Sequence, residues 1–403
     1  MNKLIITPVD GRILTALLEN SRVIQMDLEE EDASILGNIY VGKVKNIAKN
    51  INSAFVEFAD RQMAYYSLSD NRVHNFTSPG HQGSLKAGDE IIIQISRDAV
   101  KSKDPVATAK ISFAGRYCVL TCGKTQITCS SKIGSQPWKE MIRQRLLPYM
   151  EDGFGVIVRT NAWDVSPETI VEELEVLKAQ FHKVMEEGRY RTSKSLIFRS
   201  VPPCVARLRD TYSHNMEEIL TDDPVIFSQL KEYLTVHQKE DLSKLRLYTD
   251  TMVSLSNVYQ LEKAMEEALS RHVWLRSGGY LVIDPTESMT VIDVNTGKYS
   301  GKKNLHDTIM KINLEAAEEI SRQLRLRNLS GIIVADFIDM ELEEDRKLLL
   351  KTLSAYCLQD PVKTTVVDIT KLNLVEITRK KIRKPLYEQI KEKNRKERET
   401  ERK

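Results

Sequence analysis

The chain opens with short apolar stretches divided by turn residues, a pattern typical of β-strands. The stretch KLIITP is followed by Asp10-Gly11, a strong turn signal, and then by RILTALLEN and RVIQMDLE. These stretches predict an antiparallel hairpin with a third strand beside it. Because such short strands cannot bury a core alone, we expect residues 1–35 to join a later part of the chain.

Residues 36–115 keep a purely β pattern. Turn residues such as Asp60 and Ser78-Pro79-Gly80 separate short stretches that are rich in β-branched and aromatic residues. Several such strands over roughly 80 residues are typical of a small Greek-key barrel of the OB type. The expected strands are NIYVGKVKNI, SAFVEFA, QMAYYSL, DEIIIQISRD and VATAKISFAG.

Residues 116–205 mix strands with one clear helix. The segments YCVLTC, GFGVIVRTN and SLIFRSV have the composition of strands. A helix is predicted over residues 167–188, with Ser166 as its N-cap, Pro167 at its first position and Gly188 as its stop.

Beyond residue 205 the pattern is mixed and then becomes α/β. In and around residues 206–270 we expect a strand at CVARLRD, a helix at FSQLKEYLTV and one long amphipathic helix at NVYQLEKAMEEALSRHV. Residues 271–390 begin with a hairpin, GGYLVIDPTESMTVIDVNTG, and continue with a helix over Lys311–Arg325. A buried strand, GIIVADFID, then precedes the helix LEEDRKLLLKTLSAYCLQ and the strand TTVVDIT. The predicted fold class is therefore multidomain, with α+β and α/β parts.

Length and composition narrow the class of protein. A chain of 403 residues exceeds one ordinary core, so we expect several structural units. With 41% hydrophobic and 29% charged residues, collagen-like and wholly disordered chains are excluded. No apolar run reaches the roughly 18 residues of a spanning helix, and the N-terminus lacks a signal-peptide pattern. We therefore predict a cytoplasmic protein without a membrane span, whose 5 cysteines are reduced.

The C-terminal segment is basic although the chain as a whole is nearly neutral. Residues 379–403 contain 12 Lys and Arg against 5 Asp and Glu, a net charge of +7. The whole chain carries +2, so the remaining residues carry −5. A basic tail (residues 391–403 at its end) favours a polyanionic partner. A solvated helix end is the other interpretation.

Two carboxylates stand out in the α/β part. Asp293 interrupts the strand of VIDVNTG, Asp336 closes that of GIIVAD, and a helix of suitable length lies between them. If that helix packs on the sheet, the two strands can be neighbours and the carboxylates can converge. Converging carboxylates repel unless a cation satisfies both, and Mg²⁺ binds through one or two carboxylates with water and phosphate oxygens. Asn295 would face the same side and could orient a ligand.

A second interpretation of these carboxylates is purely structural. Asp293 could begin a turn, and Asp336 could cap a strand end. Asp284 and Asp339 fit the same local description, so the local sequence does not select a pair.

Two further features indicate nucleic-acid chemistry. Exposed aromatics with basic neighbours suit single-stranded nucleic acid, because bases stack on rings while Lys and Arg meet phosphates. Phe55 and Tyr65 stand on adjacent expected strands, near Lys43, Lys45, Arg61 and Lys103. Arg159 and Thr160 end another strand, where a guanidinium beside a hydroxyl can bind a terminal phosphate. Judged from these residues alone, an ordinary structural role is the favoured interpretation of both features. No Walker loop, GxGxxG or HExxH motif is present.

Several long motifs resemble the ribonuclease E/G family. They are VIDVNTG, NLEAAEEISRQLRLRNLSGIIVADFIDM and KLNLVEITRKKIRKPL in the α/β part, GNIYVGKVKNIAKNINSAFVEF in the expected barrel, and FGVIVRT. The likeness runs in order from about residue 1 to residue 386 and is nearer to the shorter, G-type members. It implies an endoribonuclease that cleaves single-stranded, AU-rich RNA with Mg²⁺, in RNA turnover or rRNA 5′ maturation. The expected products carry 5′-monophosphate and 3′-hydroxyl ends, and Mn²⁺ is an alternative ion.

The resemblance also implies a domain for each segment. Residues 1–35 and 206–270 would form an RNase H-like subdomain, and residues 36–115 an OB-fold RNA-binding barrel. Residues 116–205 would form a 5′-monophosphate sensor region. Residues 271–390 would form a DNase I-like catalytic domain, followed by the tail of residues 391–403.

The same resemblance implies a role for each site residue. The family's metal-binding pair falls on Asp293 and Asp336, with Asn295 as support. Its 5′-phosphate sensor falls on Arg159 and Thr160, with Val119 beside them and Lys363 where the family has an arginine. Its RNA-contacting barrel residues fall on Phe55, Tyr65 and Lys103.

One departure from the family pattern concerns assembly. After RKKIRKPL the family commonly has a Cys-x-x-Cys pair that links two subunits through zinc, and this chain has YEQIKEKNRKERETERK there. We therefore expect no structural zinc and no zinc-linked dimer, and another homo-oligomer stays open. Two other functions also stay open: a non-catalytic RNA-binding protein that keeps the fold, and a ribosome-assembly factor.

Overall fold

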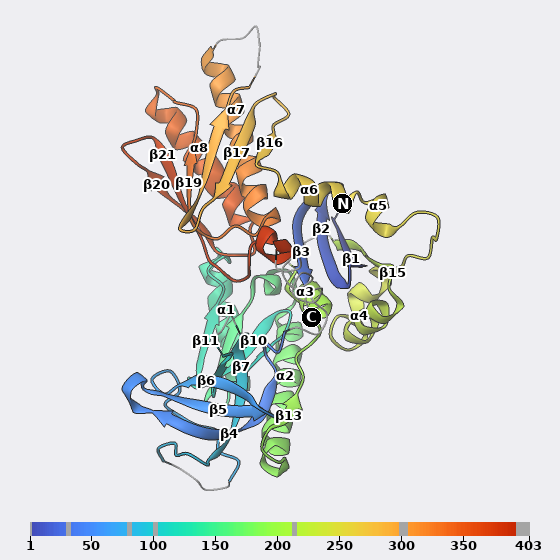
Figure 1. Cartoon of the computed structure of the whole chain (residues 1–403), viewed down its shortest axis with the longest axis vertical. Coiled ribbons are helices and arrows are strands. Elements are labelled where there is room, and N and C mark those ends of the chain that lie inside the picture. Colours follow the sequence, from blue (N-terminus) through green and yellow to red (C-terminus); the bar gives the residue numbers. More distant parts are fainter. Residues whose placement is uncertain are drawn as a thin grey trace, which may run out of the picture. The chain divides into compact units, whose positions relative to one another are not determined.

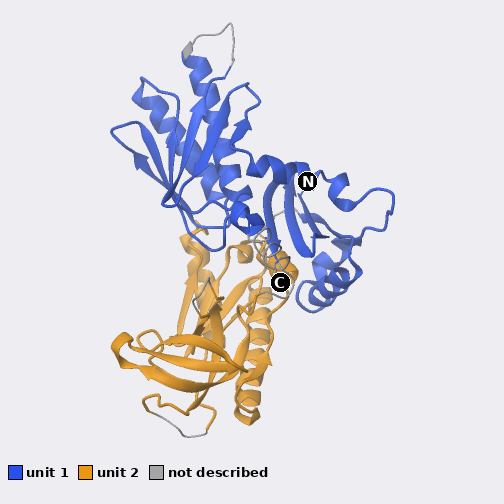
Figure 2. Ribbon diagram, in the orientation of Figure 1, with its two compact units in different colours: residues 1–30, 215–403 blue, residues 31–214 orange. Residues whose placement is uncertain are grey.

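The computed structural model describes residues 2–29, 34–78, 83–99, 104–211, 216–297 and 305–391. The chain divides into two compact units (Figure 2). Unit 1 contains Met1–Glu30 and Asn215–Lys403, and unit 2 contains Glu31–His214. This division confirms that the N-terminal strands join a later part of the chain. The finer domain boundaries stay a prediction.

The first sheet of unit 1 has the order β15-β14-β1-β2-β3. Its strands are β1 (Asn2–Val9), β2 (Arg12–Glu19), β3 (Arg22–Glu29), β14 (Met216–Thr221) and β15 (Leu245–Leu247). The expected hairpin is β1–β2, and β1 also pairs in parallel with β14. The helix α4 (Pro224–His237) begins where the Asp223 carboxylate accepts the backbone N–H groups of residues 225 and 226.

The long helix expected at NVYQLEKAMEEALSRHV is wrong. The segment forms α5 (Leu255–Val258) and α6 (Leu261–Leu269), and it ends in the strand β16 (His272–Trp274). Gln260 adopts a left-handed backbone conformation with φ of 51°, which interrupts the α-helical path. The apolar spacing is helical on both sides of this break, so periodicity alone did not reveal it.

The second sheet of unit 1 is six-stranded, with the order β16-β17-β18-β19-β21-β20 (Figure 1). Its other strands are β17 (Tyr280–Pro285), β18 (Met289–Asn295), β19 (Gly331–Asp336), β20 (Thr364–Ile369) and β21 (Leu374–Arg379). The helices α7 (Leu305–Leu326) and α8 (Glu343–Leu358) share one core with the buried side chains of this sheet.

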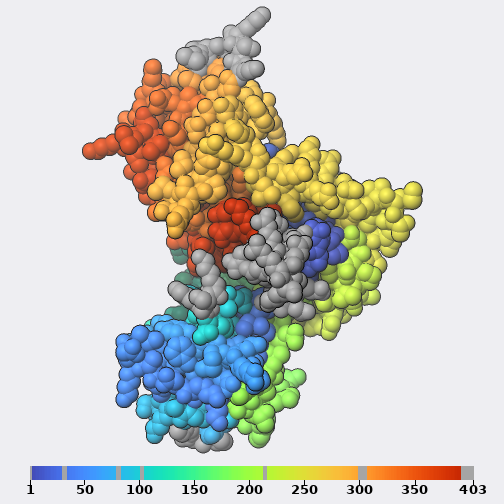
Figure 3. Space-filling view, in the orientation of Figure 1, coloured from blue at the N-terminus to red at the C-terminus, as the bar shows by residue number. Residues whose placement is uncertain are grey.

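Strand alternation gives this sheet one buried face and one exposed face. Ile292, Val294 and Ala335 lie in the core with the two helices, whereas Val291 and Ile332 are 40% and 52% exposed. We call the exposed side the open face, and it includes every second residue of β18 from Met289 to Asn295. In the space-filling view of Figure 3 the segment around residues 270–295, in yellow, lies at the surface of unit 1.

The first part of unit 2 is a closed five-stranded barrel. The strands β4 (Ile39–Ala48), β5 (Ser53–Ala59), β6 (Gln62–Ser67), β8 (Val106–Thr108) and β7 (Glu90–Arg97) pair in this order, and β7 pairs again with β4. The expected small OB-like barrel is therefore present. The strand β13 (Ser195–Phe198) pairs with the first residues of β4, ahead of those that pair with β5.

The single strand expected at VATAKISFAG is wrong, because the chain bends after β8. The Asn71 carboxamide oxygen accepts the Ala109 N–H at 2.8 Å, and Asn75 Nδ2 donates to the Ala109 carbonyl at 2.7 Å. With these side-chain partners the Ala109 backbone needs no strand neighbour. The next strand, β9 (Ser112–Ala114), belongs to a different sheet.

The second sheet of unit 2 has the order β11-β12-β10-β9. It contains β10 (Cys118–Cys122), β11 (Gln126–Cys129) and β12 (Phe154–Val158), and it packs with α1 (Gln136–Leu146) and α2 (Pro167–Tyr190) around one core. The helix α1 was not expected from the sequence. Across the described residues of both units, the short 3₁₀ helices are Lys49–Ile51, Leu147–Tyr149, Thr160–Asp164 and Lys239–Lys244.

Two expectations for this part of unit 2 are wrong. The segment CVARLRD is not a strand but lies in the helix α3 (Pro203–Asp210), which has a proline at its first position. The helix α2 continues through Gly188 to Tyr190. A Cβ on Gly188 would lie 2.5 Å from Ile92 Cδ1, so this glycine permits close packing instead of ending the helix.

Candidate functional site

Asp293 and Asp336 lie directly opposite each other in the second sheet of unit 1. The strands β18 and β19 are parallel neighbours, and their register pairs these two residues. Both aspartates are exposed, whereas the residues beside them in each strand are buried. Both side chains therefore project from the open face, near the carboxyl ends of the two strands.

The local electrostatics favour a cation at this pair. Partial burial raises the pKa of the Asp336 carboxyl, and the negative charges of Asp293 and Asp339 raise it further. A raised pKa means that the carboxylate form is disfavoured until positive charge arrives. A divalent cation bound by both aspartates would supply that charge.

Asn295 holds one of the two carboxylates. It lies two residues after Asp293 on the same face of β18, and its Nδ2 donates to Asp293 Oδ2 at 2.7 Å. This hydrogen bond fixes the orientation of the Asp293 carboxylate, as the outer-shell partners of metal ligands commonly do.

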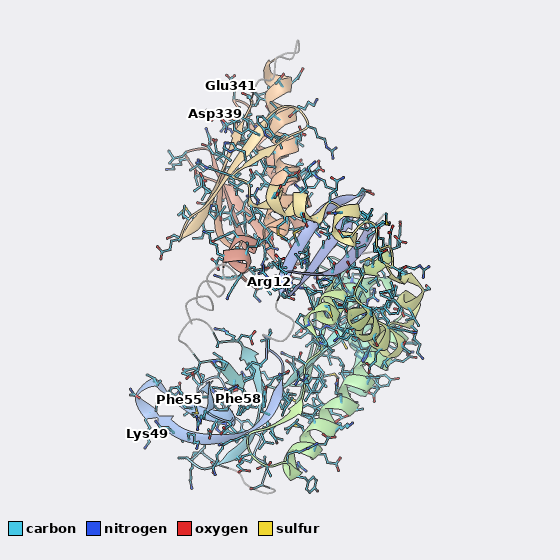
Figure 4. The ribbon with its side chains drawn as sticks, turned by 45° about the vertical axis from the view of Figure 1, so that its right-hand side comes forward. Arg12, Lys49, Phe55, Phe58, Asp339 and Glu341 are labelled. Atoms are coloured by element: carbon cyan, nitrogen blue, oxygen red, sulfur yellow. The ribbon has the colours of Figure 1, made fainter. Side chains whose placement is uncertain are left out.

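The structure distinguishes Asp284 and Asp339, which the sequence could not separate from the pair. Arg271 binds Asp284 with two hydrogen bonds of 2.6 and 2.5 Å, which lower the pKa of that carboxyl. Asp284 is therefore engaged in its own ion pair. Asp339 follows β19, accepts a hydrogen bond from Asn373 at 3.2 Å, and acts electrostatically on Asp336. It is a third acidic residue of the site that sequence reasoning did not select, and Figure 4 labels it.

The donor set of this site consists of hard oxygen atoms. In the described part of the chain no three His, Cys, Asp or Glu side chains form a cluster that could hold a metal ion by themselves. Mg²⁺ fits such a site, because it commonly uses only one or two carboxylates and completes its octahedron with water and phosphate oxygens. A soft or tetrahedral metal would need sulfur or imidazole ligands.

Phe55 and Tyr65 form an aromatic pair on the outside of the barrel. They are directly opposite each other on β5 and β6, with ring centroids 6.2 Å apart and planes at 79°. Both are half-buried and lie outside the barrel core, whereas Phe58 of the same strand is buried and packs on Tyr40. Figure 4 labels Phe55 and Phe58 on the barrel. Ser53 Oγ donates to the Tyr65 hydroxyl at 2.5 Å and so fixes that ring.

The basic residues expected near this pair have different surroundings. Lys45 forms an ion pair of 2.9 Å with Glu57, and Lys194 forms another of 3.0 Å with the same carboxylate. Together they lower the pKa of Glu57 to about 2, with Lys45 the larger cause. Lys103 lies outside the described residues.

Arg159 follows β12, and hydrogen bonds from one of its guanidinium nitrogens fix its position. Its Nη1 donates to the Gly115 carbonyl at 2.7 Å and to Asp210 Oδ1 at 2.8 Å. Burial opposes the charge of Asp210, but Arg159 and Arg209 outweigh it and lower the pKa of that carboxyl. Within the described residues Arg159 Nε and Nη2 make no hydrogen bond, so one edge of the guanidinium fork is available for an anion.

The other predicted sensor residues have separate positions. Thr160 begins a 3₁₀ helix beside Arg159, and its hydroxyl lies 3.0 Å from Ser130 Oγ. Val119 of β10 pairs with Ile157 of β12. Ile157 lies two residues before Arg159. Lys363 is exposed just before β20 in unit 1, whereas the other three residues belong to unit 2. A shared site that includes Lys363 stays a prediction.

The fold and these sites define a multidomain α+β protein with an OB-like barrel and an acidic site on an exposed sheet face. A sequence profile of the Ribonuclease E/G family matches residues 112–382. The chain belongs to the Ribonuclease E/G family.

Individual relatives extend the match over most of the chain. Ribonuclease G of Salmonella typhimurium (strain SL1344) is 32% identical over 389 residues, which cover 94% of this chain and 79% of that protein. Ribonuclease G of Escherichia coli (strain K12) is 32% identical over 392 residues, or 94% of this chain and 80% of that protein. Ribonuclease E of Synechocystis sp. (strain ATCC 27184 / PCC 6803 / Kazusa) is 33% identical over 358 residues, which are 88% of this chain and 53% of that protein.

Within the described residues, no helix combines the length and apolar character required to cross a bilayer.

Proposed function

We propose that this protein is a Mg²⁺-dependent endoribonuclease that cuts single-stranded, AU-rich RNA and contributes to rRNA 5′ processing and mRNA turnover. The observation that carries the proposal is the register pairing of Asp293 with Asp336 on the open face. Membership of a family whose relatives are named Ribonuclease G and Ribonuclease E supports RNA as the substrate.

In this proposal Asp293 and Asp336 hold the ion, which polarises the scissile phosphate when it is bound. Asn295 keeps the Asp293 carboxylate in one orientation through its 2.7 Å hydrogen bond. Water attacks phosphorus, the bond to the 3′ oxygen breaks, and that oxygen takes a proton. The products carry a 5′-phosphate and a 3′-hydroxyl.

The barrel and the Arg159 pocket bind parts of the substrate that do not react. Phe55 and Tyr65 offer ring surfaces to bases, since aromatic stacking accepts any base. The free edge of the Arg159 guanidinium can bind a 5′-monophosphate in a bidentate way. We infer that this contact makes RNA with a 5′-monophosphate a better substrate.

A cleavage assay tests the proposed reaction. The protein is mixed with a fluorescently labelled AU-rich oligonucleotide in Mg²⁺ or in EDTA, and product ends are assigned by phosphatase and ligation treatment. The proposal expects internal cuts only with Mg²⁺, with ligatable 5′-phosphate ends. RNA binding without any cut in Mg²⁺ or Mn²⁺ would indicate instead the non-catalytic RNA-binding protein.

A further inference from the structure

Trp274 is an unusually exposed aromatic residue on the open face of unit 1. Its surface is 69% exposed, although a tryptophan normally buries most of its large ring. Its ring packs against that of Tyr280, with centroids 5.3 Å apart and planes at 55°. The ring of His272 lies 5.9 Å from the same tyrosine. The edge strand β16 thus presents aromatic surface to solvent.

The strand register places this aromatic pair in line with the acidic site. Trp274 pairs with Tyr280 across β16 and β17, and Tyr280 pairs with Asn295 across β17 and β18. Asn295 in turn donates to Asp293. Because neighbouring strands lie about 4.8 Å apart, the tryptophan is on the order of 10 Å from the strand that carries Asp293. A distance of this size can be spanned by a nucleotide next to the reacting phosphate.

The turn between β16 and β17 is fixed against the end of β18. A Cβ on Gly279 would lie 2.8 Å from the Asn295 carbonyl oxygen, and a Cβ on Gly297 would collide with the Gly278 carbonyl. These close approaches require glycine on both sides. The aromatic pair is therefore held at a defined place relative to Asn295 and Asp293, as a preorganised binding surface requires.

We infer that Trp274 and Tyr280 form a stacking platform for one nucleobase of the RNA, beside the phosphate held at Asp293 and Asp336. The inference rests on the proposed function and extends it to a base contact in unit 1, separate from the barrel. An aromatic face accepts any base, so the platform positions the strand at the acidic site without reading its sequence. The continuity of Trp274, Tyr280, Asn295 and Asp293 along neighbouring strands favours RNA over a protein partner.

The experiment combines a protein variant with a modified substrate. Single-turnover cleavage is measured for the full chain and for Trp274→Ala, on an oligonucleotide with one cleavage site and on versions with an abasic position on either side of it. Loss of one stacked base corresponds to a rate that is about 5- to 140-fold lower at subsaturating protein. Trp274→Ala should show this loss on the intact RNA and no further loss on the RNA whose stacked base is missing. Trp274→Phe should keep most of the rate.

The controls separate this inference from its rivals. Val367 is 55% exposed on β20, at the opposite edge of the same sheet, and Val367→Ala should cleave every substrate as the unaltered chain does. If Trp274→Ala lowers the cleavage rate equally on intact RNA and on all abasic RNAs, the stacking platform is wrong. The proposed endoribonuclease activity is not affected by that result. If Trp274→Ala cleaves normally and only loses self-association in sedimentation, the surface binds protein and the platform is wrong. If the unaltered chain cuts no RNA in Mg²⁺, the proposed function and the platform both fall.

Discussion

Asp293 and Asp336 occupy one register position on the parallel strands β18 and β19, with both carboxylates on the open face. The helix α7 makes this possible, because it fills the crossover between the two strands and packs on the other side of the sheet. The arrangement places two negative charges next to each other, and the charge of Asp293 is one of the causes that raise the pKa of Asp336. The repulsion between these two carboxylates is the physical basis of the predictions about the acidic site.

Removing one of these charges should stabilise the protein when no divalent ion is bound. The folded state raises the pKa of Asp336, so it binds more protons than the unfolded state as pH passes the usual carboxyl range. Stability from this group is therefore lost as pH rises through the folded pKa. In EDTA at neutral pH, Asp336→Asn should melt at a higher temperature than the unaltered chain. The difference should shrink as pH falls toward 4, the usual range of a carboxyl group.

Asp284 supplies a matched control for that melting experiment. Its pKa is lowered by Arg271, so its charged form stabilises the fold above the usual carboxyl range. Asp284→Asn should thus lower the melting temperature at neutral pH or leave it unchanged. An Asp336→Asn variant that melts lower than the unaltered chain in EDTA would show that Asp336 is not under repulsion.

The proposed binding of a 5′-monophosphate by Arg159 can be tested with two forms of one RNA. Arg159→Ala should raise the activation free energy for cleavage of a 5′-monophosphorylated oligonucleotide by roughly 1.5–3 kcal/mol, and so lower the cleavage rate. This is the range for a hydrogen bond to a charged group. The same RNA with a 5′-hydroxyl should be cut at the parental rate. An equal loss on both substrates would refute the sensor role.

Asp210 should act on this response through the position of Arg159. Its carboxylate and the Gly115 carbonyl hold Nη1 of the guanidinium. Asp210→Ala should weaken the preference for a 5′-monophosphate less than Arg159→Ala does, because the positive charge remains. A preference that is fully retained in Asp210→Ala would show that this ion pair does not position the guanidinium.

Sequence reasoning anticipated the topology of the acidic site for a physical reason. A buried apolar strand, a helix of suitable length and a second apolar strand nearly enforce a parallel pair, so Asp293 and Asp336 could be expected to converge. What it could not predict was the ion pair of Asp284 with Arg271. That contact depends on the pairing of β16 with β17, and no local pattern encodes it.

The errors in the predicted elements have local causes. The break at Gln260 depends on one left-handed residue within an otherwise helical spacing. The continuation of α2 through Gly188 depends on the close approach of Ile92, which belongs to the barrel strand β7. The bend after β8 depends on two asparagine side chains that lie far from it in sequence. Each is decided by tertiary contacts that hydrophobic periodicity does not record.

The aromatic pair on the barrel should contribute to RNA affinity. Phe55→Ala should weaken binding of a single-stranded oligonucleotide by about 1–3 kcal/mol, the cost of one lost base stack. Fluorescence anisotropy in EDTA measures this without cleavage. Val73, 78% exposed after β6, serves as a control, since Val73→Ala removes an exposed apolar side chain without removing a ring. Unchanged affinity of Phe55→Ala would exclude a stacking role.

The buried ion pair of Arg379 with Asp360 should matter for stability. The two side chains are 3% and 2% exposed and 2.7 Å apart, and Arg379 also donates to Asn328 and to the Leu329 carbonyl. Asp360→Ala leaves a buried guanidinium without its counter-charge, so it should destabilise the protein by about 3–5 kcal/mol in urea unfolding. Glu343→Ala breaks an exposed pair with Lys347, which water and salt screen, so it should leave the urea midpoint nearly unchanged. Similar costs for both variants would contradict this account.

The most direct test of the acidic site separates chemistry from binding. Single-turnover cleavage of a 5′-monophosphorylated AU-rich oligonucleotide in Mg²⁺ is compared with its affinity in EDTA, for the unaltered chain, Asp293→Asn and Asp336→Asn. Loss of either carboxylate should slow cleavage by several orders of magnitude and change the affinity by less than about threefold, since the barrel and the Arg159 pocket are untouched. Parental cleavage rates in both variants would contradict a nucleolytic centre at these two aspartates.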